Sequence, residues 1–573
     1  MNSSSAFNYF FRKSPLLRAL LWILFAVLFT VISLFVSKKL KILPEIKELK
    51  PPIGSPGDIV VINGHGFGNS KDSGYVDFGG STLTASSYIL WSDEQIKIVL
   101  PPDVQDGLVT VKTKNGRSNP AFFANKNAAP VAIMPDKASI LPTVTSFSPE
   151  TPVVGGEFII YGMNFGTIRD KSQVFFSIQR GETRTQRNES ENSGIREENK
   201  ENLRFIPCNE DDFDYEYWSD NEIRVRIPDG AVAGEAYIQT AKGKSPEVFV
   251  KITGKAGVKA FISPKTYLIQ TAVDIDDTAN DKDSSIILRC PRPYITAAQP
   301  LVQLTNSKYE PVIENYQHST IYQVRKDNAK EEKKRFSEDF MIYVYEMRTE
   351  ISAAKLGKRD GINPELYEYA TRADECVPSD DEAVHDLLKK IIGNEKNAYN
   401  IAALTYNYMV ENFTVLNDVR RGKISSLDLI KTKTGDAYDF AIIFTALLRA
   451  AGIPALPDSG ILVDADMKAQ NHWWCEFYLS EFGWVPADPA LGAGLDYQPW
   501  RKDTDVKKYY FGNLDAQHIL FSRGWNEIKP SSPQNKTVTR RRTFALQGIW
   551  EEALGKNIKY GSYWADPVVL GVY

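Results

Sequence analysis

One histidine and one aspartate in the last third of the chain fall in segments that predict neighbouring strands. His472 lies in residues 471–479, a run rich in aromatic and apolar residues, and Asp488 lies in residues 484–490, after a short turn. A carboxylate that accepts a hydrogen bond from an imidazole holds the ring in one tautomer, and the ring can then take a proton from a nucleophile. The pair therefore indicates acid–base chemistry, provided that a nucleophile lies beside it.

A helix that begins at residue 437 is the element expected to bring the third group. Its apolar positions recur at helical spacing, so residue 437 points inward at the first turn. A thiol at this place would have a lowered pKa, because the N-terminus of a helix carries partial positive charge. The residue found there is Ala437, whose methyl group has no lone pair and no proton to lose.

Three blocks around these residues carry a resemblance to a known family: "GDAYDFAIIFTALLRAAGIPA", "HWWCEFYL" and "GWVPADPA". Their order resembles the transglutaminase-like fold, with its papain-like Cys–His–Asp triad, over roughly residues 360–500. The resemblance implies that Ala437 takes the place of the cysteine, His472 that of the base and Asp488 that of the orienting carboxylate. Without the sulfur no acyl-enzyme can form, and loss of a triad nucleophile removes several orders of magnitude of turnover. We therefore favour a silent domain, in which the pair is retained because it supports the fold.

Other interpretations of the site stay open. Cys475, three residues beyond His472, is a possible substitute for the missing nucleophile. Strand alternation should, however, turn its side chain to the face opposite His472. A metal site formed by Asp436, His472 and Asp488 would contain a single histidine, which is a weak signal, so we expect no metal and no cofactor. If Ala437 is an engineered replacement of cysteine, the natural protein is an acyl-transfer enzyme of the cysteine protease or transglutaminase type.

An internal repeat fills much of the first half of the chain. Residues 86–123 parallel residues 213–250, both with a Trp-Ser-Asp motif, and residues 59–68 parallel residues 158–166. Alternating apolar residues between glycine-rich turns predict β-sandwiches. The motifs resemble the immunoglobulin-like IPT/TIG domain, which implies a spacer or interaction module over residues 42–127 and again over 142–252. The second copy carries a polar insertion, which lies mostly within residues 179–202.

The N-terminus contains an apolar segment, "ALLWILFAVLFTVISLFV", over residues 19–36. Its length suits a membrane-spanning helix, and no small-residue cleavage site follows it. We expect an uncleaved signal anchor with a short cytoplasmic segment, together covering residues 1–41. The bulk of the chain would then be periplasmic or on the cell surface.

Composition excludes some other classes of function. A formal net charge of −4 gives no electrostatic basis for binding nucleic acid. The four cysteines form no CxxC pair and the five histidines are dispersed, so neither a zinc knuckle nor a redox motif is indicated. We expect His65, His385 and His518 to be structural.

The predicted fold class is multidomain: an N-terminal transmembrane helix, immunoglobulin-like β-sandwiches, and an α+β transglutaminase-like domain. A β-rich domain is expected over residues 256–355, and an extension packed on the core over residues 501–573. The expected function is that of a membrane-anchored, extracytoplasmic pseudoenzyme, acting in protein or peptide binding or in envelope structure. The predicted partners are the membrane and a protein or peptide, while the oligomeric state stays open.

Overall fold

The computed structural model describes the chain from residue 43 to the C-terminus, with internal gaps. The residues left out are 73, 79–80, 102–103, 105–106, 126–140, 182–202, 255, 280–284, 326–332, 358–360, 423, 501–504, 526–527, 529, 531–534, 547 and 555–558. The chain divides into two compact units. The first runs up to Ser139 and includes Gly166–Lys171 and Tyr217–Asp220, and the second contains the rest. Each unit is described by itself.

The N-terminal sandwich packs two sheets around one apolar core. One sheet has the order β1 (Glu45–Lys50), β3 (Ile59–His65), β7 (Gln95–Val99) and β6 (Tyr88–Trp91). The other has the order β2 (Ile53–Gly54), β10 (Ala121–Asn125), β8 (Gly107–Thr113), β4 (Tyr75–Phe78) and β5 (Ser81–Thr82), with β9 (Gly116–Arg117) beside β8. Alternation along β3 and β7 buries Val60, Ile62, Ile96 and Ile98. The predicted sandwich is therefore present.

The second copy of the repeat forms two sheets with a closely similar strand order. One sheet runs β11 (Thr143–Ser148), β12 (Glu157–Met163), β16 (Glu222–Arg226), β15 (Tyr215–Trp218). The other runs β14 (Phe205–Pro207), β13 (Gln173–Ile178), β17 (Ala231–Thr240), β18 (Gly243–Lys244), with β19 (Val248–Val250) beside β17. Most of the predicted insertion lies outside the described residues.

A shared hydrogen bond explains the Trp-Ser-Asp motif. The Asp93 carboxylate accepts the backbone N–H of Gly68, and the Asp220 carboxylate accepts that of Gly166, each over 2.9 Å. Both glycines have φ near +90°, in the left-handed region that glycine adopts readily. The motif therefore fixes the same tight turn in each copy.

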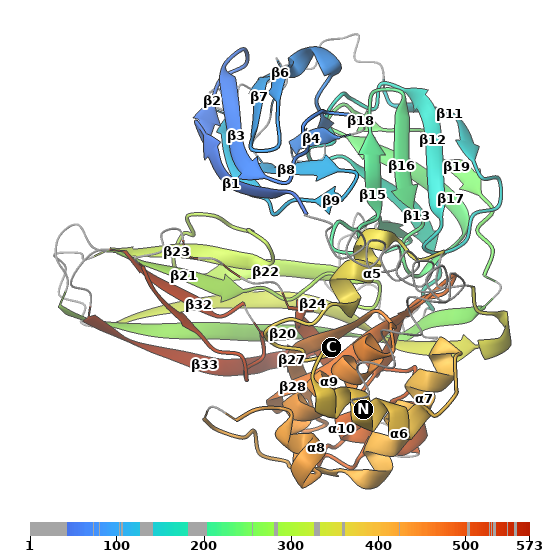
Figure 1. Ribbon diagram of the computed structural model, residues 1–573. Coiled ribbons are helices and arrows are strands. Elements are labelled where there is room, and N and C mark those ends of the chain that lie inside the picture. Colours follow the sequence, from blue (N-terminus) through green and yellow to red (C-terminus); the bar gives the residue numbers. More distant parts are fainter. Residues whose placement is uncertain are drawn as a thin grey trace, which may run out of the picture. The chain divides into compact units, whose positions relative to one another are not determined.

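Two long strands organise the middle β-sandwich. β20 (Gly257–Ala279) pairs with β24 (Lys333–Ile351) along nearly its whole length, in a sheet of order β22 (Leu301–Ser307), β24, β20, β33 (Lys559–Val572). The second sheet has the order β23 (Ser319–Arg325), β21 (Ser285–Pro291), β32 (Trp550–Leu554), β31 (Lys536–Thr539). Figure 1 shows the C-terminal strands, coloured red, lying beside strands that precede them by more than two hundred residues. The end of the chain therefore completes both sheets of the predicted β-rich domain.

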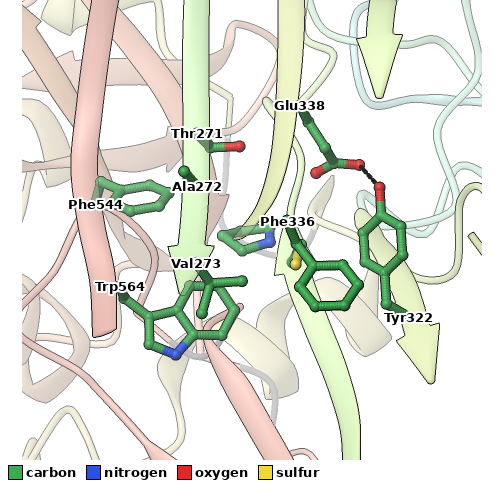
Figure 2. Close-up of a pocket in the computed structure, with 10 residues that line it drawn as sticks. Thr271, Ala272, Val273, Tyr322, Phe336, Glu338, Phe544 and Trp564 are labelled. Carbon is green, nitrogen blue, oxygen red and sulfur yellow. Dashed lines mark hydrogen bonds between the residues drawn. The ribbon is translucent and has the colours of Figure 1, made fainter. Parts of the chain in front are cut away.

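A small cavity lies within this middle sandwich, with Val273, Phe336 and Trp564 among its apolar walls (Figure 2). The Tyr322 hydroxyl donates to Oε1 of Glu338 over 3.0 Å, while Oε2 of Glu338 has no hydrogen-bond partner in the described part of the chain. Burial raises the pKa of Glu338, which favours its protonated form. The space suits about one water molecule beside that carboxyl group.

The α+β core is arranged around helix α9 (Ala437–Ala450). A four-stranded antiparallel sheet of order β29 (Gly483–Ala487), β28 (Ala469–Leu479), β27 (Ala455–Val463), β30 (His518–Arg523) packs against it. Helices α5 (Pro364–Thr371), α6 (Glu382–Ile392), α7 (Ala398–Asn412) and α8 (Asp428–Thr432) also contact α9 (Figure 1). Every residue of α9 except Ala450 is buried, as expected for a helix whose residues are mostly apolar.

Four short elements complete the core. Two-residue strands β25 (Thr414–Val415) and β26 (Thr434–Gly435) pair with each other, and β26 ends one residue before α9 begins. Helices α10 (Pro489–Gly492) and α11 (Val506–Tyr509) follow the sheet strand β29. These elements set the position of the first turn of α9 and of the residues after β29.

The predicted fold class is wrong on one point. No helix among the described residues is long and apolar enough to cross a membrane, and this part of the chain forms β-sandwiches and the α+β core. The predicted membrane helix over residues 19–36 lies outside the described residues.

Candidate functional site

The first turn of α9 is closed by a reciprocal capping box. The Asp439 N–H donates to Oδ1 of Asp436 over 3.0 Å, and the Asp436 N–H donates to Oδ2 of Asp439 over 3.1 Å. Ala437 is therefore the first helical residue, and its exposed fraction is 5%. A side chain at this position lies at the N-terminal end of the helix, where the backbone N–H groups have no acceptor within the helix.

Two arginines neutralise the capping carboxylates. Arg542 donates to both oxygens of Asp436, over 2.8 and 2.6 Å, and to Oδ1 of Asp439 over 2.7 Å. Arg420 donates its backbone N–H to Asp436 over 2.7 Å, and its guanidinium forms an ion pair with Asp439 over 2.5 Å. The Arg542 guanidinium also lies 4.3 Å from the centre of the Tyr438 ring. Asp436 thus caps the helix, and both of its carboxylate oxygens accept hydrogen bonds from protein groups.

His472 and Asp488 form a buried hydrogen-bonded pair. Strand β28 places His472 with none of its surface exposed, and Nε2 lies 2.5 Å from Oδ2 of Asp488. Asp488 also caps α10, because its Oδ1 accepts the N–H of Leu491 over 2.9 Å. Burial would raise the pKa of Asp488, but the adjacent His472 and His518 hold it well below its usual range.

The other ring nitrogen of His472 is free. Nδ1 is buried and has no hydrogen-bond partner within the described residues. In the triad that the sequence resembles, one ring nitrogen of the base faces the nucleophile and the other faces the carboxylate. In this protein Nε2 of His472 faces the carboxylate of Asp488, and Nδ1 is the nitrogen without a partner.

His518 joins this pair, and the sequence interpretation missed its role. Its Nε2 lies 3.2 Å from Oδ2 of Asp488, and its Nδ1 lies 2.7 Å from Oδ1 of Asp515. Burial lowers the pKa of His518, but the two carboxylates outweigh burial and raise it to about 9. The available signal was Asp515, three residues before the histidine, but only the pairing of β30 with β27 brings His518 to the site.

The remaining candidates do not reach the site in a reactive form. Cys475 is buried and its thiol donates to the carbonyl of Ala487 over 3.2 Å. Burial raises the pKa of Cys475 well above its usual value, which disfavours the thiolate. His385 is exposed on α6, away from the buried group.

Three atoms of metal-ligand type lie within 4.8 Å of one another: one each from His472, Asp488 and His518. The separations of 2.5 and 3.2 Å between nitrogen and oxygen match hydrogen bonds. Asp436 is not part of this group. The arrangement therefore fits proton transfer and charge pairing, and the expected absence of a metal stays a prediction.

Comparisons with known proteins identify two parts of the chain. The transglutaminase-like superfamily matches residues 385–489, and the IPT/TIG domain matches residues 44–127. A Haemophilus influenzae protein without an assigned function is 31% identical over 171 residues, which cover 25% of this chain and 46% of the relative. A cyclomaltodextrin glucanotransferase from Bacillus licheniformis is 41% identical over 80 residues, or 14% of this chain and 11% of that enzyme. The chain thus spans less than half the length of either relative.

Solved structures give only a remote likeness. A Cytophaga hutchinsonii protein named as a candidate cysteine protease has a TM-score of 0.36 and 14% identity, over 55% of this chain and 93% of that one. The periplasmic domain of TgpA from Pseudomonas aeruginosa has a TM-score of 0.24 and 12% identity, over 41% of this chain and 88% of that one. Neither likeness carries an argument about function. On the family matches, residues 385–489 are a transglutaminase-like domain, and residues 44–127 are an IPT/TIG domain.

Proposed function

We propose that the protein is a catalytically silent transglutaminase-like protein that binds a peptide segment without forming a covalent bond to it. The observation that carries the proposal is the combination of Ala437 at the first turn of α9 with the buried His472–Asp488 pair. A base and its orienting carboxylate are retained, while the group that would attack an acyl carbon is a methyl. Such a site can hold a ligand but cannot form an acyl-enzyme.

The free nitrogen of His472 supports binding as the retained activity. A buried polar atom without a partner is unfavourable, and a ligand that supplies a hydrogen bond would relieve this once the core opens to admit it, since His472 is fully buried. The described cysteines offer no substitute nucleophile, because all four are buried with reduced thiols. Covalent chemistry by another thiol would require the core to open.

The second candidate function is acyl transfer by a protein with cysteine at position 437. It is favoured by the same pair, because Asp488 already holds the ring of His472 through a hydrogen bond to Nε2. The two candidates share one fold and differ by one atom, so a single substitution separates them.

The test compares three forms of the full chain with a short peptide that carries a thiol-reactive acrylamide group. We expect Ala437→Cys to be labelled at residue 437, this chain to remain unlabelled, and the double variant Ala437→Cys, His472→Gln to react at least about tenfold more slowly, since the base is lost. Rapid labelling of this chain would contradict a silent site.

Binding is measured with the same peptide lacking the acrylamide group, by titration calorimetry on this chain. We expect binding that weakens in His472→Ala, because the free ring nitrogen is lost. Equal affinity in the variant, or no binding of the peptide, would contradict the proposed binding role.

The predicted extracytoplasmic location stays a prediction. Protease digestion of intact cells and of lysates measures it directly, and digestion only after lysis would argue against exposure at the cell surface.

A further inference from the structure

The buried site contains two histidines and two aspartates whose protons can be placed from geometry. Both ring nitrogens of His518 face carboxylate oxygens, Nε2 toward Asp488 over 3.2 Å and Nδ1 toward Asp515 over 2.7 Å. A neutral imidazole carries one N–H and would turn the lone pair of its other nitrogen toward a negative oxygen. His518 therefore carries both protons and a positive charge.

Asp515 is held in its ionised form by several donors. Its Oδ1 accepts from His518 and from the Gln517 N–H over 3.1 Å, and its Oδ2 accepts from the Tyr510 hydroxyl over 2.7 Å and the Tyr497 hydroxyl over 3.3 Å. Four donors therefore face this carboxylate, which disfavours a proton on either of its oxygens. The proton that His518 shares with Asp515 thus stays on the imidazole.

The positive charge on His518 determines the protonation state of His472. Oδ1 of Asp488 is taken by the Leu491 N–H, so both histidines address Oδ2 of Asp488. The charge of Asp488 is already opposed by the cationic His518, and a second proton on His472 would sit on Nδ1, which is buried without an acceptor. A buried cation without a full set of partners is strongly disfavoured.

We propose that His518 is a positioning residue that keeps His472 neutral, with its proton on Nε2 and a lone pair on Nδ1. The site then presents a hydrogen-bond acceptor and selects a ligand group that donates, such as a peptide N–H or a hydroxyl. The ligand class rests on the proposed function, whereas the charge assignment stands on the geometry alone.

Titratable and aromatic side chains from three parts of the fold face the ring of His518. Asp488 comes from the start of α10, His472 and Trp474 from β28, and Tyr510 and Asp515 from the segment before β30. Among these described groups only the two aspartates carry negative charge opposite the ring. Removal of the His518 charge therefore leaves Asp488 to be neutralised by His472.

The test is a nitrogen-15 NMR spectrum of the histidine rings in the full chain at pH 7. Five histidines are present, and His472→Gln and His518→Gln assign the two signals of interest. We expect two protonated ring nitrogens for His518 and one for His472. A neutral His518, or a doubly protonated His472, would overturn the proposal.

The variant His518→Gln adds a second, independent readout. Its amide can donate a hydrogen bond to Asp488 but carries no charge, so we expect the ring-nitrogen signals of His472 to change. The matched control is His318→Gln, which removes a half-exposed histidine whose Nε2 lies 2.9 Å from Asp211. An unchanged His472 signal in folded His518→Gln would contradict the positioning role.

If His518→Gln does not fold, replacement of each of the other four histidines in turn identifies the His518 signal by elimination, and the spectrum of the unsubstituted chain then decides the charge assignment. The peptide titration reports separately on binding. If the spectrum is as expected but the peptide does not bind, the proposed function is contradicted. The charge assignment is not affected by that result.

Discussion

The chemistry of the site depends on which atoms of a few buried residues are paired. His472 and Asp488 could be predicted from sequence because each lies in a recognisable block, and the pair forms with a separation of 2.5 Å. His518 could not, because it lies 46 residues beyond His472 in a segment without a motif, and its approach depends on strand pairing. Sequence thus indicated the first partner of Asp488 and missed the second.

Removal of the negative charge from this pair should destabilise the fold. In Asp488→Asn both imidazoles lose a negative partner, and His518 keeps a buried charge opposed by Asp515 alone. We expect a loss of about 3 kcal/mol in the free energy of unfolding, measured by urea denaturation near pH 6.5. A change below about 0.5 kcal/mol would show that the charges are solvated and not buried.

The stability should also depend on pH through His518. Its pKa rises from 6.5 to about 9 on folding, so its contribution is fully present below pH 6.5 and is lost as the pH increases through 9. The full effect is roughly 3 kcal/mol by linkage. Denaturation of the unsubstituted chain and of His518→Gln should therefore differ more at pH 6 than at pH 10; a constant difference would contradict the assignment.

At the scale of elements, helix α9 was the clearest prediction from the sequence. The ion pairs that hold its first turn could not be predicted. The expected start at residue 437 is present, and Asp436 caps the helix. The ion pairs come from Arg542, which lies more than one hundred residues away, beyond the sheet. Nothing in the local sequence distinguishes Arg542 from its neighbours Arg540 and Arg541.

Two adjacent arginines provide a matched pair of substitutions. Arg542 contacts both capping aspartates and is 14% exposed in its side chain, whereas Arg541 pairs with Glu375, whose side chain is 64% exposed. We expect Arg542→Ala to lower the free energy of unfolding by about 3 kcal/mol and Arg541→Ala by at most about 1 kcal/mol. Equal effects in thermal denaturation would show that the capping aspartates do not depend on Arg542.

At the scale of the whole molecule, the repeat was visible in the sequence. The pairing of the C-terminal strands with the two sheets of the middle sandwich was not. The Trp-Ser-Asp motif recurs because each aspartate binds a glycine N–H in the same turn. Strands β31, β32 and β33 instead pair with strands far earlier in the chain, and long-range pairing leaves no local signal. The segment predicted to extend the core over residues 501–573 therefore also supplies strands to the middle sandwich.

This pairing predicts which fragments fold. A fragment of residues 360–500 lacks β30, so it loses a strand that pairs with β27 together with His518. We expect this fragment to be unfolded by circular dichroism, while a fragment of residues 257–573 unfolds cooperatively. A stable, cooperative fragment of residues 360–500 would contradict the view that the later strands are part of the core.

The proposed site lacks one sulfur atom, which Ala437→Cys would supply at the first turn of α9. The most direct measurement is the rate of alkylation of Ala437→Cys by iodoacetamide between pH 5 and pH 10, with Ala437→Cys, His472→Gln as control. A thiol at the N-terminus of α9 beside a competent base should react with a pKa clearly below the ordinary value of about 8.5, and the control should return toward that value. An ordinary pKa that does not change when His472 is replaced would contradict the account.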